Sequence, residues 1–271
     1  METNNQIWNK VESLVKEYND LNISDSIDYN RFYLYSIISH STAIEGSTLT
    51  EIETQILLDD GLTAKGKPMI HHLMNQDLRD AYNFAFEAAM KKMPVTPELL
   101  KQLSSLVMKS TGSVYNGISG QWDSSKGDFR LHGVTVGTGG KSYVNFKKVP
   151  ELTDQICAEI NKRLVQVGTL KEILTLSFDA HLNLVTIHPW GDGNGRMARL
   201  IMNYIQLFYR QIPSKIFRED KAEYILSLRN SQDSNNPEAF RNFMLEQQIK
   251  MLNEEILNFR QTQKKGFNFM F

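Results

Sequence analysis

The chain has 271 residues, and 30 Lys and Arg residues stand against 31 Asp and Glu residues, for a formal net charge of −1. This balance argues against a dedicated nucleic-acid binder, because such proteins carry clustered basic surface. The single cysteine excludes a disulfide framework and a cysteine-rich zinc site. The sequence has no apolar run of about eighteen residues and no signal-peptide pattern, so we expect a cytoplasmic protein without membrane association.

Apolar residues recur at helical spacing through most of the sequence. Residues 170–187 are apolar on nearly every face, which is typical of a helix at the centre of a helical domain. We therefore expect an all-α fold, a helical bundle around a central helix-loop-helix. The spacing predicts helices over residues ~5–19, ~28–44, ~50–59, ~66–92, ~97–110, 149–165, 170–187, ~194–210, ~218–231 and ~236–260.

One glycine-rich region, residues 111–146, interrupts the helical pattern. Two short runs that favour β-structure, Leu131–Val136 and Ser142–Phe146, flank a turn at residues 137–140. Glycine adopts the positive φ angles that a tight turn requires. The region therefore predicts a small β-hairpin with these two strands.

The segment from His188 to Arg199 has the features of an anion site at the start of a helix. Pro189 disfavours helical geometry at the residue before it, so the central helix should end at His188. Gly193 and Gly195 let the backbone approach an anion closely where the next helix begins. The first N–H groups of a helix are unpaired, and its dipole favours negative charge there.

Four side chains add acid–base chemistry and charge to this site. Arg196 and Arg199 lie three residues apart, and two cations at a helix N-terminus oppose the dipole unless several phosphates bind there. Asp192 offers a hard oxygen ligand, and Mg²⁺ takes one or two carboxylates together with substrate phosphates. Histidine, here His188, is the side chain suited to removing a proton near neutral pH. Together they indicate displacement at a nucleotide phosphate by a base-activated nucleophile.

The residues from His188 to Arg199, HPWGDGNGRMAR, resemble the Fic family signature HPFx[D/E]GNGRxxR, with Trp190 in place of the usual Phe. Fic proteins are helical enzymes, most of which transfer AMP from ATP to a hydroxyl on a target protein, and the resemblance covers about residues 97–250. It implies a general base at His188, a Mg²⁺ ligand at Asp192, and phosphate-binding residues at Gly193, Asn194, Gly195, Arg196 and Arg199.

Two further assignments rest on this resemblance. Fic proteins usually carry a β-hairpin flap that pairs with a backbone strand of the target, and residues 131–146 fit that place. Tyr224 lies in a stretch similar to the one near the adenine, although a tyrosine on an amphipathic helix is more often a core residue. The implied ligands are ATP, Mg²⁺ and a hydroxyl-bearing target protein; self-AMPylation and a homo-oligomer are possibilities that the sequence leaves open.

Residues 41–46 carry a second pattern. Ser41 and Glu45 lie four apart near the end of a predicted helix, and Gly46 is placed to cap that end. A glutamate in the last turn meets the negative end of the helix dipole, which costs ~0.3–1 kcal/mol unless a cation offsets it. The pattern resembles the inhibitory motif [S/T]xxxE[G/N] of Fic proteins, which implies that Glu45 pairs with Arg199 and blocks productive binding of the γ-phosphate.

The sequence thus predicts a Mg²⁺-dependent protein adenylyltransferase with a built-in inhibitory helix. Residues 1–96 form the N-terminal helical region with the inhibitory helix at about 28–46, residues 97–250 form the Fic core, and residues 251–271 form a helix end and an aromatic tail. The alternatives are the same fold with another nucleotide or phosphate donor, removal of AMP from a modified protein, and a catalytically silent binding module.

Overall fold

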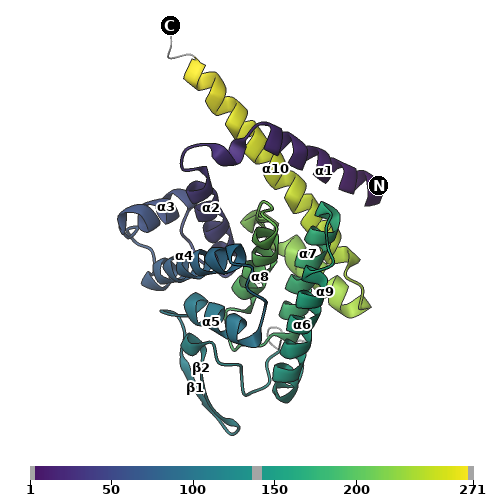
Figure 1. Cartoon of the computed structure of the whole chain (residues 1–271). Coiled ribbons are helices and arrows are strands. Elements are labelled where there is room, and N and C mark those ends of the chain that lie inside the picture. Colours follow the sequence, from purple (N-terminus) through teal and green to yellow (C-terminus); the bar gives the residue numbers. More distant parts are fainter. Residues whose placement is uncertain (1–3, 136–141, 268–271) are drawn as a thin grey trace.

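The computed structural model describes residues 4–135 and 142–267, and the chain in these ranges is predominantly helical, as predicted (Figure 1). Apart from short 3₁₀ turns, the regular elements are α1 (Asn4–Asp20), α2 (Tyr29–Ile44), α3 (Glu51–Asp60), α4 (Met69–Met90), α5 (Pro97–Val107), β1 (Val114–Gly117), β2 (Gly120–Asp123), α6 (Val149–Leu164), α7 (Leu170–Ile187), α8 (Asn194–Phe208), α9 (Lys221–Ser234) and α10 (Glu238–Phe267).

Helix α7 has sharp boundaries that the local sequence explains. It begins at a capping box, in which the Thr169 hydroxyl accepts from the Glu172 N–H at 3.2 Å and the Glu172 carboxylate accepts from the Thr169 N–H at 2.9 Å. It ends at Ile187, because His188 adopts a left-handed conformation with φ of 54° before Pro189. Its last residue therefore leads directly into the segment that the sequence singled out.

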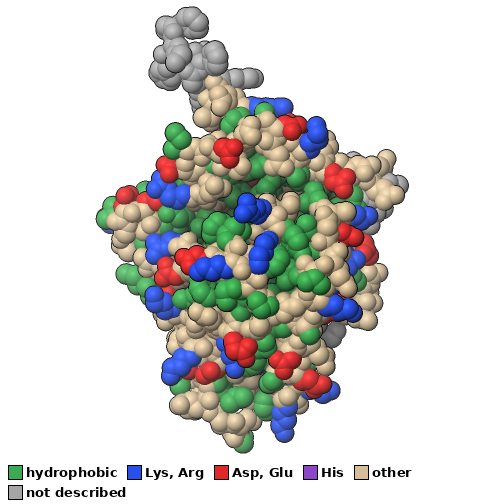
Figure 2. All heavy atoms as spheres, viewed as in Figure 1, with side chains coloured by type: hydrophobic (Ala, Val, Ile, Leu, Met, Phe, Trp, Pro, Cys, Tyr) green, Lys and Arg blue, Asp and Glu red, His purple; other side chains and the backbone are tan. Residues whose placement is uncertain are grey.

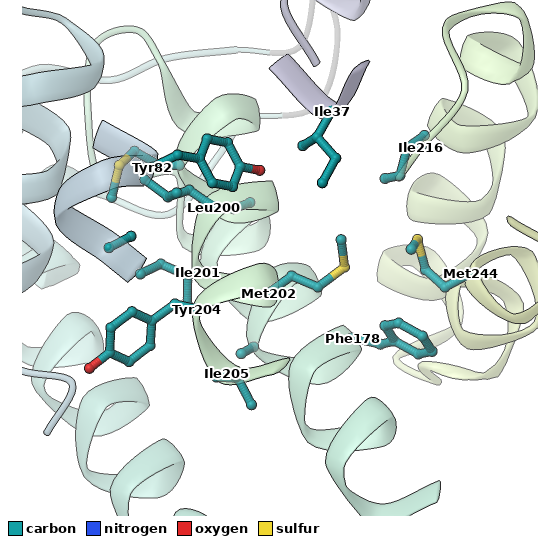
Figure 3. Close-up of a cluster of buried hydrophobic side chains, with 14 of the residues drawn as sticks. Ile37, Tyr82, Phe178, Leu200, Ile201, Met202, Tyr204, Ile205, Ile216 and Met244 are labelled. Atoms are coloured by element: carbon teal, nitrogen blue, oxygen red, sulfur yellow. The ribbon is translucent and has the colours of Figure 1, made fainter. Parts of the chain in front are cut away.

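Helices α7 and α8 form the centre of the fold. Figure 3 shows Leu200, Ile201, Met202, Tyr204 and Ile205 of α8 among side chains from the surrounding helices. All five are at most 1% exposed, and burying a side chain of this size contributes about 1.5–3 kcal/mol each. Because α8 is packed on all sides, its N-terminal turn is held in a fixed position. The surrounding side chains labelled in Figure 3 are Ile37, Tyr82, Phe178, Ile216 and Met244.

Helices α1 and α10 lie side by side at one end of the molecule, and the β1–β2 hairpin lies at the opposite end (Figure 1). Helix α10 runs without a break through residue 250, where the sequence placed a domain boundary. The aromatic tail falls partly outside the described residues, since residues 268–271 are not among them.

The regular hairpin is β1–β2. In the described part of residues 131–146 the chain pairs only next to the predicted turn, so the prediction of regular strands over 131–135 and 142–146 is wrong. Among the described residues of that region, Thr135 and Ser142 form a single antiparallel bridge, and the predicted turn lies outside the described residues. The next pair of a longer ladder in this register would use the carbonyl of His132, which accepts instead from the guanidinium of Arg130 at 2.7 Å. The same guanidinium donates to the Val144 carbonyl at 2.6 Å. The ladder therefore does not continue beyond the bond from the Tyr143 N–H to the Val134 carbonyl.

Strands β1 and β2, which were not predicted from the sequence, pair antiparallel with Tyr115 opposite Trp122. Their rings stack with centroids 5.1 Å apart, and such cross-strand aromatic pairs stabilise a hairpin. The turn between the two strands consists of Ile118 and Ser119, which form no Asn-Gly or Asp-Gly turn signal, so the sequence pattern did not reveal this hairpin.

The surface shown in Figure 2 carries acidic and basic side chains interspersed with one another. This distribution agrees with the nearly neutral net charge of the chain. Within residues 4–135 and 142–267, the helices lack the combination of length and apolar content that crossing a membrane requires.

Candidate active site

The loop between α7 and α8 is closed by the side chain of Asn194. Its amide Oδ1 accepts from the Trp190 N–H at 3.1 Å, and its Nδ2 donates to the Trp190 carbonyl at 2.9 Å. The Trp190 ring is fully buried, and its Nε1 donates to the Gly127 carbonyl at 3.1 Å. The larger ring is therefore accommodated in the interior, and the side chain of Asn194 shapes the loop.

Both glycines of the loop stand where a side chain would collide with a neighbour. Gly193 has a φ of 79°, and a Cβ there would lie 2.8 Å from Met108 Sδ. A Cβ at Gly195 would overlap Oε1 of Glu45. The N–H of Gly193 donates to Asp192 Oδ1 at 2.6 Å, so the expected phosphate donor and the expected metal ligand contact each other in this structure.

Arg199 is held by the end of helix α2. Its Nε donates to the Ser41 hydroxyl at 2.8 Å, and one terminal nitrogen, Nη2, donates to the Ser41 carbonyl at 3.0 Å and to Glu45 Oε1 at 2.6 Å. The other terminal nitrogen, Nη1, donates to the Tyr224 hydroxyl at 3.4 Å. The structure thus brings Ser41 and Glu45 together with Arg199, which lies more than 150 residues away from both in the sequence.

Glu45 and Arg199 each stabilise the charged form of the other. Burial alone would raise the pKa of Glu45, but the charge and hydrogen bond of Arg199 outweigh it and lower that pKa. Burial likewise disfavours the charged form of Arg199, and Glu45 outweighs it and raises the pKa of the guanidinium. A third of the Glu45 side chain remains solvent-exposed, whereas Arg199 is 3% exposed. An ionised carboxylate therefore lies against the first turn of α8.

Arg196 faces a different element from Arg199, although the two are one turn apart. Its Nη1 donates to the Val107 carbonyl at the end of α5 at 3.2 Å, and its Nη2 lies 3.9 Å from Asp192 Oδ1. The side chain is 2% exposed, and its Nε is buried without a partner. In this state the guanidinium is directed into the protein beside the loop.

Tyr224 is a buried residue at the wall of the site. Its hydroxyl lies 3.0 Å from His181 Nε2 and accepts from Arg199. Burial raises its pKa to about 12. The hydroxyl therefore supports the guanidinium of Arg199, a contact that the sequence analysis did not foresee.

His188 lies at the rim of a cavity of about 250 Å³ that also borders Glu45, Gly195 and Arg199. The ring of Tyr143 stacks on its imidazole, with centroids 3.9 Å apart and planes inclined by 20°. Burial and the positive charge of Arg130 lower the pKa of His188 to about 4. The imidazole is therefore neutral at physiological pH, as a proton acceptor must be.

Sequence reasoning missed three residues that shape this site. Tyr143 covers the imidazole, His181 contacts Tyr224, and Arg130 contacts the backbone of His188. An isolated arginine, tyrosine or histidine carries no spacing signal. Their places follow only from the packing of segments distant in the sequence.

Comparison with known proteins identifies related sequences and folds. Residues 94–206 match the model of the Fic/DOC family. The curated protein adenylyltransferase fic-1 of Caenorhabditis elegans is 29% identical over 230 residues, which cover 80% of this chain and 41% of that protein. Protein adenylyltransferase Fic of Drosophila mojavensis is 30% identical over 200 residues, which cover 72% of this chain and 36% of that protein. The chain thus spans about two fifths of the length of the curated relatives it matches.

The fold is also similar to that of solved structures. A Fic domain-containing signaling protein from Bacteroides thetaiotaomicron superimposes with a TM-score of 0.78 at 21% identity, over 93% of this chain and 98% of that one. At this identity the likeness shows the fold alone, and it covers more of the chain than residues 94–206, which match the family model.

Proposed function

We propose that this chain, whose residues 94–206 form a Fic/DOC family domain, transfers AMP from ATP to a hydroxyl side chain of a target protein. One observation carries the proposal: a single cavity joins a neutral imidazole, that of His188, to a helix N-terminus where Arg199 already holds an anion. The adenylyltransferase names of the curated relatives support the same activity. The reaction depends on Mg²⁺ and is held back by Glu45.

The chemistry follows from the positions of these groups. The hydroxyl oxygen of the target forms a bond to the α-phosphorus of ATP, while the bond from that phosphorus to the bridging oxygen of pyrophosphate breaks. The proton of the hydroxyl passes to the imidazole of His188. The N–H groups of Gly193 and Gly195 and the N-terminus of α8 stabilise the phosphate charges, and Arg196 and Arg199 neutralise the leaving pyrophosphate and the γ-phosphate.

The position of Asp192 suits a Mg²⁺ ion whose other ligands include the phosphates of the substrate. Its carboxylate is 62% exposed and lies beside the start of α8, which leaves room for a cation and its other ligands. Mg²⁺ bound through one carboxylate and substrate phosphates supplies charge neutralisation along the triphosphate. In this structure the carboxylate accepts from the Gly193 N–H, so metal binding and phosphate binding would free both groups together.

The proposal assigns the inhibition to competition for Arg199. Glu45 and Ser41 occupy its Nε and Nη2 atoms, and Oε1 of Glu45 lies against Gly195, where a phosphate would approach. A γ-phosphate therefore meets a carboxylate of the same charge. The division into residues 1–96, 97–250 and 251–271 and the binding of the target along residues 131–146 are parts of the same proposal, as is self-modification.

The identity of the donor is tested by intact mass. The Glu45→Gly variant is incubated with Mg²⁺ and either ATP or another nucleotide or phosphate donor, together with a host lysate. We expect protein substrates, or the variant itself, to gain the mass of one adenylyl group with ATP. A different mass increment, loss of AMP from an already modified protein, or no increment with any donor would contradict AMP transfer.

Replacing Asp192 with alanine should lower AMP transfer by about 100-fold at saturating ATP, because the developing charge on the phosphates loses its metal. The rate is measured against Mg²⁺ concentration in the Glu45→Gly background. Asp154→Ala, which removes an exposed aspartate of α6, serves as the control. If the rate of the Asp192→Ala variant depends on Mg²⁺ concentration as that of its parent does, Asp192 is not the Mg²⁺ ligand.

The pH dependence of kcat/KM should reflect the low pKa of His188. A base acts in its neutral form, so activity is lost only as the pH falls toward the folded pKa of about 4. In the Glu45→Gly variant we expect a constant kcat/KM from about pH 6 to pH 8. A loss of half the activity near pH ~6.5, the ordinary histidine pKa, would contradict this assignment.

A further inference from the structure

We propose that Arg130 is a positioning residue that fixes the backbone of His188 against both ends of the flap, here residues 131–135 and 142–146. The inference rests on the proposed function, because it concerns the residue assigned as the base. Arg130 lies far from the signature in the sequence and is 0% exposed.

The guanidinium of Arg130 joins three segments of the chain. Its Nε donates to the His188 carbonyl at 2.7 Å, its Nη1 to the His132 carbonyl at 2.7 Å, and its Nη2 to the Val144 carbonyl at 2.6 Å. The main-chain N–H of Arg130 donates to the Pro189 carbonyl at 3.0 Å. One residue therefore holds the two peptides that follow the end of α7 together with the two ends of the flap.

The position of this charge explains why an arginine can be buried here. The C-terminal carbonyls of α7 carry the negative end of the helix dipole, and Nη2 of Arg130 lies 3.4 Å from the Ile187 carbonyl. A buried cation is costly unless its donors are paired, so the surrounding carbonyls are held in one arrangement. The planar fork of an arginine reaches three carbonyls in different directions, which the single ammonium of a lysine does not.

The catalytic consequence is the placement of the imidazole. His188 has a left-handed backbone, and Arg130 holds the carbonyl of that same residue. Tyr143, which stacks on the imidazole, is the neighbour of Val144, another residue that Arg130 holds. Loss of the guanidinium should let both rings shift, and a displacement of about 1 Å in a reacting group can cost about 100-fold in rate.

The test compares Arg130→Met and Arg130→Lys in the Glu45→Gly background. We expect kcat for AMP transfer to fall about 100-fold for Arg130→Met and by a smaller factor for Arg130→Lys. The KM for ATP should stay within about twofold of the parent, because the triphosphate binds at α8 and not at Arg130. Rates are normalised to the folded fraction from thermal melting.

Arg241→Met is the matched control, since Arg241 bonds to Asp179 and Glu238 away from the site. It should lower the melting temperature and leave kcat unchanged. An unchanged kcat in Arg130→Met, or a loss that the folded fraction or a raised KM for ATP fully explains, would overturn the positioning role.

Hydrogen exchange separates failure of this inference from failure of the proposed function. In Arg130→Met we expect faster amide exchange in peptides that contain residues 142–146 and 188–190, whatever reaction the protein catalyses. If the Glu45→Gly parent shows no AMP transfer, the proposed function fails, and the exchange pattern alone then tests whether Arg130 holds these backbone segments. Unchanged exchange in those peptides would show that Arg130 does not hold them.

Discussion

Replacing Glu45 with glycine should raise AMP transfer by about 10- to 100-fold. The carboxylate accepts a charge-assisted hydrogen bond from Arg199 at 2.6 Å, and such bonds contribute about 1.5–3 kcal/mol. Because ~1.4 kcal/mol corresponds to a factor of ten, releasing Arg199 should increase the productive binding of the γ-phosphate by that range. The variant also removes the negative charge that would repel the phosphates next to Gly195.

The measurement is the initial rate of adenylyl incorporation from labelled ATP, including self-modification, in the wild-type protein and the variant. Glu53→Gly is the matched control, because it removes a carboxylate that accepts from the N–H and hydroxyl of Thr50 at the start of the neighbouring α3 and pairs with Lys67. We expect that variant to retain the low rate of the wild type. Equal or lower incorporation by Glu45→Gly would remove the inhibitory contact from the account.

Replacing His188 with alanine in the Glu45→Gly background should abolish AMP transfer while ATP still binds. A general base contributes about 10²–10⁴-fold to the rate, and the phosphate-binding groups lie on α8 and its preceding loop. The variant should therefore show the ATP affinity of its parent by calorimetry and a rate at the detection limit.

The control for this variant is His71→Ala, which removes an imidazole that contacts Thr48 outside the site. That variant should transfer AMP at the parental rate. A His188→Ala variant that labels its targets normally would show that the base lies elsewhere. If both ATP binding and AMP transfer are lost, His188 instead maintains the structure of the ATP pocket.

The helices and the phosphate-binding segment could be predicted from the sequence because their signals are local. The spacing of apolar residues predicted the helix over 170–187 with its observed bounds, and Pro189 explained where it ends. The glycines at 193 and 195 were predicted for close approach to an anion; in the structure a side chain at either would also collide with Met108 or Glu45, which lie far away in the sequence.

Other parts of the site depend on contacts between distant segments and could not be predicted in the same way. Among the described residues, the strands expected at 131–146 reduce to one bridge, because Arg130 binds the His132 carbonyl that the next pair would use and also binds the Val144 carbonyl. Nothing in the spacing of these residues reveals that a single guanidinium lies between them. Likewise, the different partners of Arg196 and Arg199 result from the neighbouring helices α5 and α2 and not from their separation of three residues.

The pairing of Glu45 with Arg199 lies between these two cases. The physics of a glutamate at a helix end indicated only that some cation should lie nearby. The family resemblance named Arg199, and the geometry has the two side chains in contact. Whether that contact restrains catalysis is a question for the variants described above.

A crystal structure of the Glu45→Gly variant with Mg²⁺ and a non-hydrolysable ATP analogue tests the central claim most directly. We predict that the triphosphate lies along the N-terminus of α8, that its γ-phosphate contacts the guanidinium freed from residue 45, and that the α-phosphorus faces the imidazole of His188. An analogue bound elsewhere, or an imidazole directed away from the α-phosphate, would contradict the account.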